Sequence, residues 1–160
     1  MPTLNDIINL GFSKHQEGRL LEAEGAYQEA LKFEGENPDV CNLMGVLKLQ
    51  QNEVDTAIEW VEKALSIKQD EYYYETLFQA CIRGGYYQKI ADTEDFIVKN
   101  FPKSFSLMFN LALAFKNLRQ NEKAISFYDK ALKIDPSSYQ AWFNLSRLYS
   151  IEGQCKNAVS

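Results

Sequence analysis

The side chains that most often carry chemistry in proteins are few in this chain and lie far apart. The one histidine, His15, has no serine, cysteine or carboxylate beside it at helical spacing that would suggest a nucleophilic triad. We interpret it as a solvated or groove-edge residue. The cysteines Cys41, Cys81 and Cys155 show no CxxC spacing and no paired histidine, so we interpret them as reduced, buried residues. The acidic run at 92–95 is interpreted as a solvated face, because a metal site would need further ligands from elsewhere.

The composition also argues against several classes of function. The sequence has no glycine-rich phosphate loop, no nucleophile with a base and no His/Cys/Glu set at metal-ligand spacing. We therefore expect no catalytic residues, no metal, no cofactor and no enzyme activity. The 160 residues carry a net charge of −5, which argues against nucleic acid or an anionic membrane as the main partner. The apolar runs are short, and the first residues lack a secretory signal. The expected location is therefore cytoplasmic.

The clearest structural pattern lies at residues 105–138, which read as two amphipathic helices joined by a polar turn. The first is predicted from about Phe105 to Leu118, with apolar residues at i, i+3, i+4 and i+7. The turn is predicted at 119–122. The second helix is predicted to stop before Pro136, because proline cannot continue a helix and restricts the residue before it. Alanines fall where the two helices would touch and would let their backbones approach closely.

This pattern recurs at a spacing of 33 or 34 residues, and small residues mark the repeat. The predicted second helices open on a small residue at Ala23, Ala57, Ala124 and Ala158, and they close on another at Ala30, Ala64 and Ala131. The predicted first helices contain a small residue at Gly11, Gly45, Ala112 and Ser146. The phrases YQEALKFEGENP, VEKALSIKQDE and YDKALKIDPSS are near copies of one another. A helix–turn–helix unit repeating at 34 residues is typical of one family of helical repeats.

The sequence resembles the tetratricopeptide repeat family over almost its whole length. The resemblance implies an all-α fold, a right-handed α-solenoid of antiparallel helix pairs with about four and a half repeats. We expect a single domain over residues 1–160, with repeats at about 4–37, 38–70, 71–104 and 105–138 and a partial repeat at 139–160.

Two repeats depart from the pattern. In the third, Phe78, Ile90 and Ile97 stand where small residues are expected, which predicts more widely separated helices or a rotated second helix, and a local change in curvature at 78–98. In the fifth, a turn is predicted at 152–154, and the second helix has barely begun at Ala158. We therefore expect the chain to be a piece of a longer protein; the alternative is a natural terminus whose last helix caps the fourth repeat.

The resemblance also implies a function, because in this family the concave surface lined by the first helices binds peptide segments of partner proteins. The positions that match this groove are Asn9, Phe12, Asn42, Val46, Leu49, Gln79, Arg83, Phe109, Asn110, Leu113, Lys116, Phe143, Asn144 and Arg147. The lysines and asparagines of the family's clamp for a C-terminal carboxylate are absent, since those places hold Ile8, Phe12, Leu43, Asp39 and Thr76. Asn9, Asn110 and Asn144 share one groove position, where they would hold a peptide backbone or only bridge neighbouring helices.

Three functions from different classes follow. The first is a protein-interaction scaffold that binds a peptide segment of a partner protein in the groove. The second is the N-terminal adaptor or substrate-binding part of a larger enzyme, such as a glycosyltransferase. The third is a self-assembling solenoid, a weak homo-oligomer joined through an apolar C-terminal face that contains Trp142, Leu145, Leu148 and Tyr149.

Overall fold

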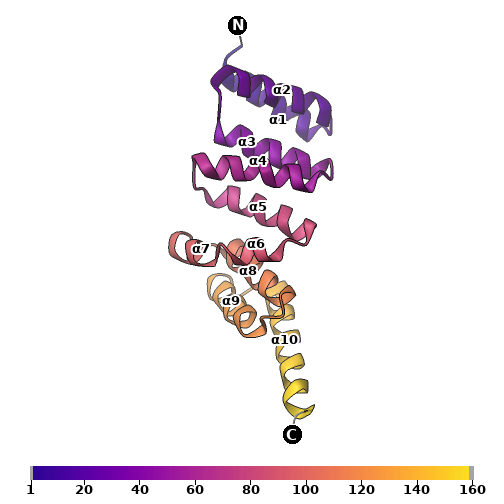
Figure 1. Ribbon diagram of the computed structural model, residues 1–160, viewed down its shortest axis with the longest axis vertical. Coiled ribbons are helices and arrows are strands. Elements are labelled where there is room, and N and C mark those ends of the chain that lie inside the picture. The colour runs from indigo at the N-terminus through magenta and orange to yellow at the C-terminus, as the bar shows by residue number, and fades with distance from the viewer. Residues whose placement is uncertain (1, 159–160) are drawn as a thin grey trace. The chain divides into compact units, whose positions relative to one another are not determined.

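The fold is all-helical throughout the part of the chain that is described. The computed structural model describes the backbone of residues 2–158 and their side chains except at 34, 152 and 154–158. Within these residues there are ten helices and no strand (Figure 1). The helices are α1 (Leu4–Gln16), α2 (Leu20–Glu34), α3 (Pro38–Gln50), α4 (Val54–Ile67), α5 (Glu71–Gly84), α6 (Tyr87–Ala91), α7 (Glu94–Asn100), α8 (Phe105–Asn117), α9 (Asn121–Ile134) and α10 (Tyr139–Ala158).

Side-chain caps begin four of the helices that open a repeat. Oxygens of Thr3, Asn37, Ser104 and Ser138 each accept a hydrogen bond from the backbone amide three residues later, at 3.2–3.3 Å. Such a cap satisfies one of the amides that a helix start leaves without a partner. Because these caps recur at the spacing of the repeat, each repeat fixes its own starting point locally.

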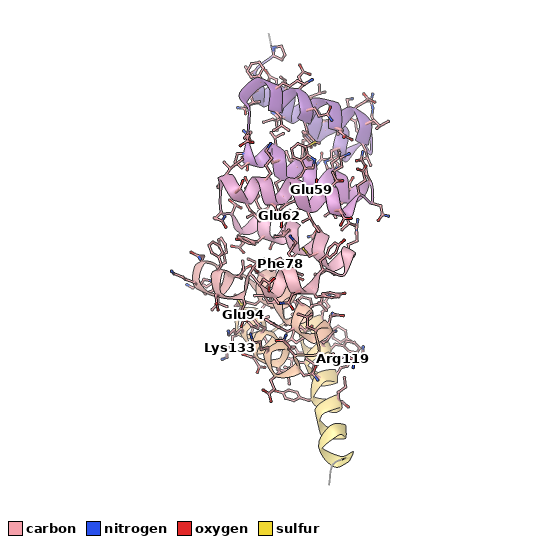
Figure 2. All side chains as sticks on the ribbon, in the orientation of Figure 1. Glu59, Glu62, Phe78, Glu94, Arg119 and Lys133 are labelled. Atoms are coloured by element: carbon pink, nitrogen blue, oxygen red, sulfur yellow. The ribbon has the colours of Figure 1, made fainter. Side chains whose placement is uncertain are left out.

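A residue in the left-handed conformation ends the first helix of each of the first four pairs. These residues are Gly18 (φ 75°), Asn52 (64°), Gly85 (75°) and Arg119 (60°). After the first, second and fourth of them, an amide donates to the carbonyl five residues earlier at 2.8–2.9 Å. This bond closes the helix end and turns the chain into the next helix. Figure 2 labels Arg119 at the last of these turns.

The described chain divides into two compact units, Met1–Gly84 and Gly85–Ser160. In the first unit, α1 packs on α2, α3 packs on α4, and α5 packs on α4 and α3. The helix crossings are close, since a Cβ added at Gly45 would lie 2.4 Å from Val61 Cγ2, and one at Gly11 would lie 2.6 Å from Tyr27. The small positions of the first two repeats are therefore needed for packing. The single-domain description of residues 1–160 stays a prediction.

A buried lysine links the first helix pair to the second. Lys48 Nζ on α3 lies 2.8 Å from Glu24 of α2 and 3.4 Å from Glu53, and Gln51 donates to Glu24 at 3.0 Å. The side chain of Lys48 is only 10 % exposed. The hydrogen bond from Lys48 lowers the pKa of Glu24. Burial opposes the charge of Lys48, but its hydrogen bonds and attraction to Glu24 raise its pKa. The pair is thus held in its ionised form.

In the second unit, α8 packs on α9, α10 packs on α9, and α6 and α7 pack on α8. The second half of the third repeat was expected to be one helix, but it is broken between α6 and α7. The hydroxyl of Thr93 donates to the carbonyl of Ile90 at 2.7 Å, and the Thr93 amide donates to the same carbonyl. That carbonyl would otherwise accept the amide four residues on, so the threonine competes with the helix.

The large residues at the small positions of this repeat are buried. Phe78, labelled in Figure 2, and Ile90 and Ile97 have no exposed surface. The change in curvature expected at 78–98 stays a prediction.

The turn predicted at 152–154 is wrong, because α10 continues through it as one helix of 20 residues. Gly153 lies 34 residues after Arg119, yet its backbone is helical. A glycine inside a helix costs only about 1 kcal/mol, which continued backbone hydrogen bonding can offset. On α10, Leu145 and Leu148 are buried, whereas Trp142 and Tyr149 are exposed. The exposed apolar face of α10 is therefore narrower than the sequence predicts, because Leu145 and Leu148 are already buried.

Candidate functional site

Three connected cavities run along α1, α3 and α5 in the unit Met1–Gly84, and together we call them the trench. Their volumes are about 360, 150 and 500 Å³. The first and second share Phe12, Leu43 and Tyr72, and the second and third share Val46 and Gln50. The full lining is Ile8, Asn9, Phe12, His15, Gln16, Asp39, Asn42, Leu43, Val46, Leu49, Gln50, Tyr72, Tyr73, Gln79, Ile82 and Arg83.

All seven groove residues predicted for this unit line the trench. They are Asn9, Phe12, Asn42, Val46, Leu49, Gln79 and Arg83. They come together because α1, α3 and α5 are the first helices of three successive repeats and present these residues on the same side. Their contact with a ligand stays a prediction.

The polar groups of the trench differ in how far they are already satisfied. Asp39 accepts a hydrogen bond from the hydroxyl of Tyr73, a residue that the sequence did not single out. Burial raises the pKa of Tyr73, and the hydrogen bond to Asp39 adds to this effect. Arg83 donates to the backbone carbonyl of Leu49. Asn42, by contrast, is 1 % exposed, and its Oδ1 is buried with no hydrogen-bond partner among the described residues.

The other seven predicted residues lie in the unit Gly85–Ser160, on two helices. Phe109, Asn110, Leu113 and Lys116 lie on α8, and Phe143, Asn144 and Arg147 lie on α10. Lys116 Nζ donates to Asn144 Oδ1 at 2.8 Å, and Asn144 Nδ2 donates to the Gln140 carbonyl at 2.9 Å. The amide of Asn144 therefore joins α8 to α10, which is the structural alternative that the sequence left open.

Positive charge gathers in this second set. Burial lowers the pKa of Lys116, and repulsion from Arg147 lowers it further. Arg147 lies 5.8 Å from the ring centre of Phe143. Across residues 2–158, no described carboxylate forms an ion pair with either cation.

Comparison with known families identifies these helix pairs. Tetratricopeptide repeat models match residues 14–79, 106–138 and 127–157. The chain belongs to the tetratricopeptide repeat family. The all-α class and the solenoid of helix pairs expected from the sequence are confirmed.

Relatives of this repeat protein are diverse. The chain is 27 % identical to the Photosystem I assembly protein Ycf3 of Acaryochloris marina over 112 residues. The matched segment covers 70 % of this chain and 60 % of Ycf3, so the chain spans less than two thirds of that relative's length. A crystal structure of MamA has a TM-score of 0.86 at 21 % identity, covering 98 % of this chain and 86 % of MamA. YrrB, described as a TPR protein with an unusual peptide-binding site, has a TM-score of 0.79 at 16 % identity, covering 94 % of this chain and 78 % of YrrB. At these identities the two structures show the fold alone.

His15 of this repeat protein is not solvated, which corrects one of the two interpretations of the sequence. It is 7 % exposed and lines the trench. His15 Nδ1 lies 3.3 Å from the hydroxyl of Tyr27, and the two rings meet edge to face. Burial lowers the pKa of His15 and raises that of Tyr27 to about 12. The signal was its spacing, because His15 follows Gly11 by four residues and so shares the face that packs on α2.

The remaining described residues with metal-binding or redox side chains lie apart from one another or are buried. Among the described residues, no three His, Cys, Asp or Glu side chains are grouped so that they could hold a metal ion. The thiols of Cys41 and Cys81 are buried and form no disulfide in the described part of the chain, and burial raises the pKa of Cys41. The side chain of Cys155 lies outside the described residues. None of the helices described is both long and apolar enough to cross a membrane.

Proposed function

We propose that this chain is a non-enzymatic, cytoplasmic protein-interaction scaffold that binds a peptide segment of a partner protein. The observation that carries the proposal is the trench, a continuous run of three cavities on the first helices of three successive repeats. Its lining combines eight apolar or aromatic residues with eight polar or charged ones, so it offers both apolar contact area and groups that can fix the orientation of a ligand. The names of similar proteins lend support, since Ycf3 is an assembly protein and YrrB has a peptide-binding site.

The physical advantage of such a surface is its length. A side chain of a bound peptide can enter each cavity, while polar side chains on the rim can bond to the peptide backbone. The aromatic rings of Phe12 and Tyr72, which are 47 % and 55 % exposed, offer contact area with few rotatable bonds. Such rings are typical anchors of binding energy.

The test is a selection of peptides from a random twelve-residue library displayed on phage, with the 160-residue chain as bait. Backbone amide shifts in NMR spectra would then locate each selected peptide. We expect peptides that bind with a Kd below about 100 μM, which is roughly −5.5 kcal/mol, and that shift amides on α1, α3 and α5. Failure to select any peptide of that affinity, or shifts confined to α2 and α4, would refute the proposal.

A second candidate function is self-assembly, favoured by the exposed aromatic residues of α10. Tyr139 is 74 % exposed, Trp142 54 %, Phe143 48 % and Tyr149 52 %. Large exposed apolar side chains in one region mark interaction surfaces more often than isolated ones do. A copy of the same chain would be the partner there.

A further inference from the structure

The trench has a chemical preference that its apolar residues alone do not reveal. We propose that it takes a peptide segment in which a lysine or arginine stands next to an aliphatic or aromatic side chain. This inference rests on the proposed function, because it names the class of peptide that the same surface would select. It is carried by an unsatisfied buried acceptor, a carboxylate at the cavity wall and the charge of the surrounding unit.

The acceptor is Asn42 Oδ1. Its amide makes no hydrogen bond within the described structure, although the residue is 1 % exposed and lines the 360 Å³ cavity. A buried polar atom without a partner is costly, and such groups in a native protein need an explanation. A donor from a bound peptide, either a backbone amide or a cationic side chain, would satisfy it.

The carboxylate is Asp39, which lines the same cavity one helical turn before Asn42. The hydroxyl of Tyr73 donates to one of its oxygens and so holds the group in place. A carboxylate can accept several hydrogen bonds, so this one keeps capacity for another donor. Two acceptors on one wall of a cavity favour a ligand that brings donors.

The wider field of the unit has the same sign. Residues 1–84 contain 15 acidic and 7 basic side chains, a net charge of −8, whereas residues 85–160 carry +3. Within the trench, the cation Arg83 belongs to the 500 Å³ cavity and already bonds to the Leu49 carbonyl. A second cation, Lys68, lies beside the other cavity, with its Nζ 5.6 Å from the ring centre of Tyr73, but it is paired with Asp70 at 2.8 Å. The cavity that holds Asp39 and Asn42 therefore has a neighbouring cation that is already neutralised, within a unit of net negative charge. Such a field speeds the association of a cationic partner and discriminates against an acidic one.

The apolar half of the preference comes from the neighbouring walls. Phe12, Leu43 and Tyr72 line both the 360 Å³ cavity and the adjoining 150 Å³ cavity. An aliphatic or aromatic side chain would bury its surface against these three, while the adjacent cationic side chain reached the carboxylate. The apolar walls and the carboxylate together favour a short peptide motif that is both basic and apolar.

The experiment uses the peptides selected from the random library and measures two properties of them. The first is composition, for which we expect enrichment of lysine or arginine beside an apolar residue among peptides that map to α1, α3 and α5. Peptides that map there but are acidic or uncharged would overturn this inference and leave the proposed function standing. Peptides that bind only through α8 and α10 would also overturn it.

The second property is the effect of isosteric variants on the Kd of the most enriched peptide, measured by calorimetry. Asp39→Asn should weaken binding about fivefold at low salt, because it removes the charge but keeps an acceptor for Tyr73. The matched control is Glu59→Gln, on the exposed side of α4 and labelled in Figure 2, which changes the net charge equally and should leave the Kd within about twofold. Equal effects of the two variants on the Kd would show that only the net charge of the chain matters and would overturn the proposed contact between Asp39 and the peptide.

Asn42→Leu should weaken the same peptide about tenfold, the value of one hydrogen bond to a buried acceptor. The free chain should unfold at the same or a higher urea concentration, since the amide has no internal partner to lose. Asn42→Asp, which keeps an acceptor and adds negative charge, should retain or tighten binding of a cationic peptide. Unchanged affinity in Asn42→Leu, or weaker binding in Asn42→Asp with the fold intact, would overturn the role of this residue.

Discussion

The crossing of α3 and α4 allows a quantitative test of the repeat packing through Gly45→Ala. The added Cβ would lie 2.4 Å from Val61 Cγ2 and 3.2 Å from the carbonyl oxygen of Ala57. Carbon atoms in contact normally stay about 3.5–4.0 Å apart, so the overlap exceeds roughly 1 Å. Valine has one strongly preferred side-chain rotamer in a helix, so Val61 cannot easily turn away. The two helices must move apart instead.

The magnitude follows from a comparison with Gly25→Ala. Gly25 is exposed on α2, and an added Cβ there would meet nothing within 4 Å. Both substitutions gain about 0.5–1 kcal/mol because alanine loses less backbone entropy in a helix than glycine. That gain cancels in the comparison, so the difference reports the overpacking alone, about 1–3 kcal/mol. Gly25→Ala should raise the free energy of unfolding and Gly45→Ala should lower it.

Urea unfolding followed by circular dichroism would measure both variants, and a double-mutant cycle would assign the cause. Val61→Ala alone removes two buried methyl groups and should cost roughly 1.5 kcal/mol. In the Gly45→Ala background it should cost much less, because the new methyl group occupies the vacated space; we expect a coupling energy above about 1 kcal/mol. Parallel shifts in the two glycine variants, or a coupling near zero, would mean that this contact does not limit how closely α3 and α4 approach.

Four further expectations can be checked. Arg119→Gly should stabilise the fold by about 0.5–1 kcal/mol in thermal denaturation, because glycine adopts φ 60° without strain; a lower melting temperature would contradict this. The pKa of Glu24 is lower in the folded state than its ordinary value of 4.5. Its contribution to stability is therefore fully present above pH 4.5 and is lost as the pH falls through the folded-state pKa. Glu24→Gln should therefore flatten the acid side of the stability curve, and an unchanged acid limb would count against the buried pair. Lys116 has a folded-state pKa below 10.5, so folding opposes its charge. The contribution of Lys116 to the free energy of unfolding should accordingly rise as the pH approaches 10.5. The wild-type chain should therefore gain stability relative to Lys116→Met over that range in a urea titration series, while the raised pKa values of Tyr27 and Tyr73 lower the stability of both chains there. Finally, if the exposed face of α10 joins two copies, sedimentation at micromolar to millimolar concentration should show weak association that Trp142→Gln with Tyr149→Ser abolishes; a strictly monomeric wild-type chain would exclude it.

The repeat architecture could be predicted because its causes are local and periodic. Small residues such as Gly45 mark the crossings within the first helices, and alanines such as Ala57 and Ala124 mark the starts of the second helices. Each of these signals recurs at the same interval, so errors at one position are corrected by the others. For the same reason, seven of the residues that line the trench could be found by counting from one repeat to the next, whereas Tyr73 was missed.

What could not be predicted depends on a single competing interaction or on tertiary surroundings. The break before α7 comes from one hydroxyl, that of Thr93, which periodicity does not detect. Gly153 stands in register with Arg119, but a turn there forms only if a following helix can pack, and the local sequence does not contain that information. The pairing of His15 with Tyr27 and the unsatisfied amide of Asn42 likewise arise only when separate helices are placed together.

The break before α7 has a consequence for how the native chain opens. The seven residues of α7 bury one side chain, Ile97, and a helix of that length has almost no stability by itself in water. The helix is also tied to α9 by the ion pair of Glu94 with Lys123 at 2.5 Å, a partly exposed contact that adds little stability. This segment should therefore open and close without unfolding of α8 or α9. Amide protons of residues 94–100 should exchange with solvent earlier than those of the neighbouring helices, and a protease should make its first internal cut there. The same property makes this segment the place where the repeat array would best tolerate an insertion during evolution.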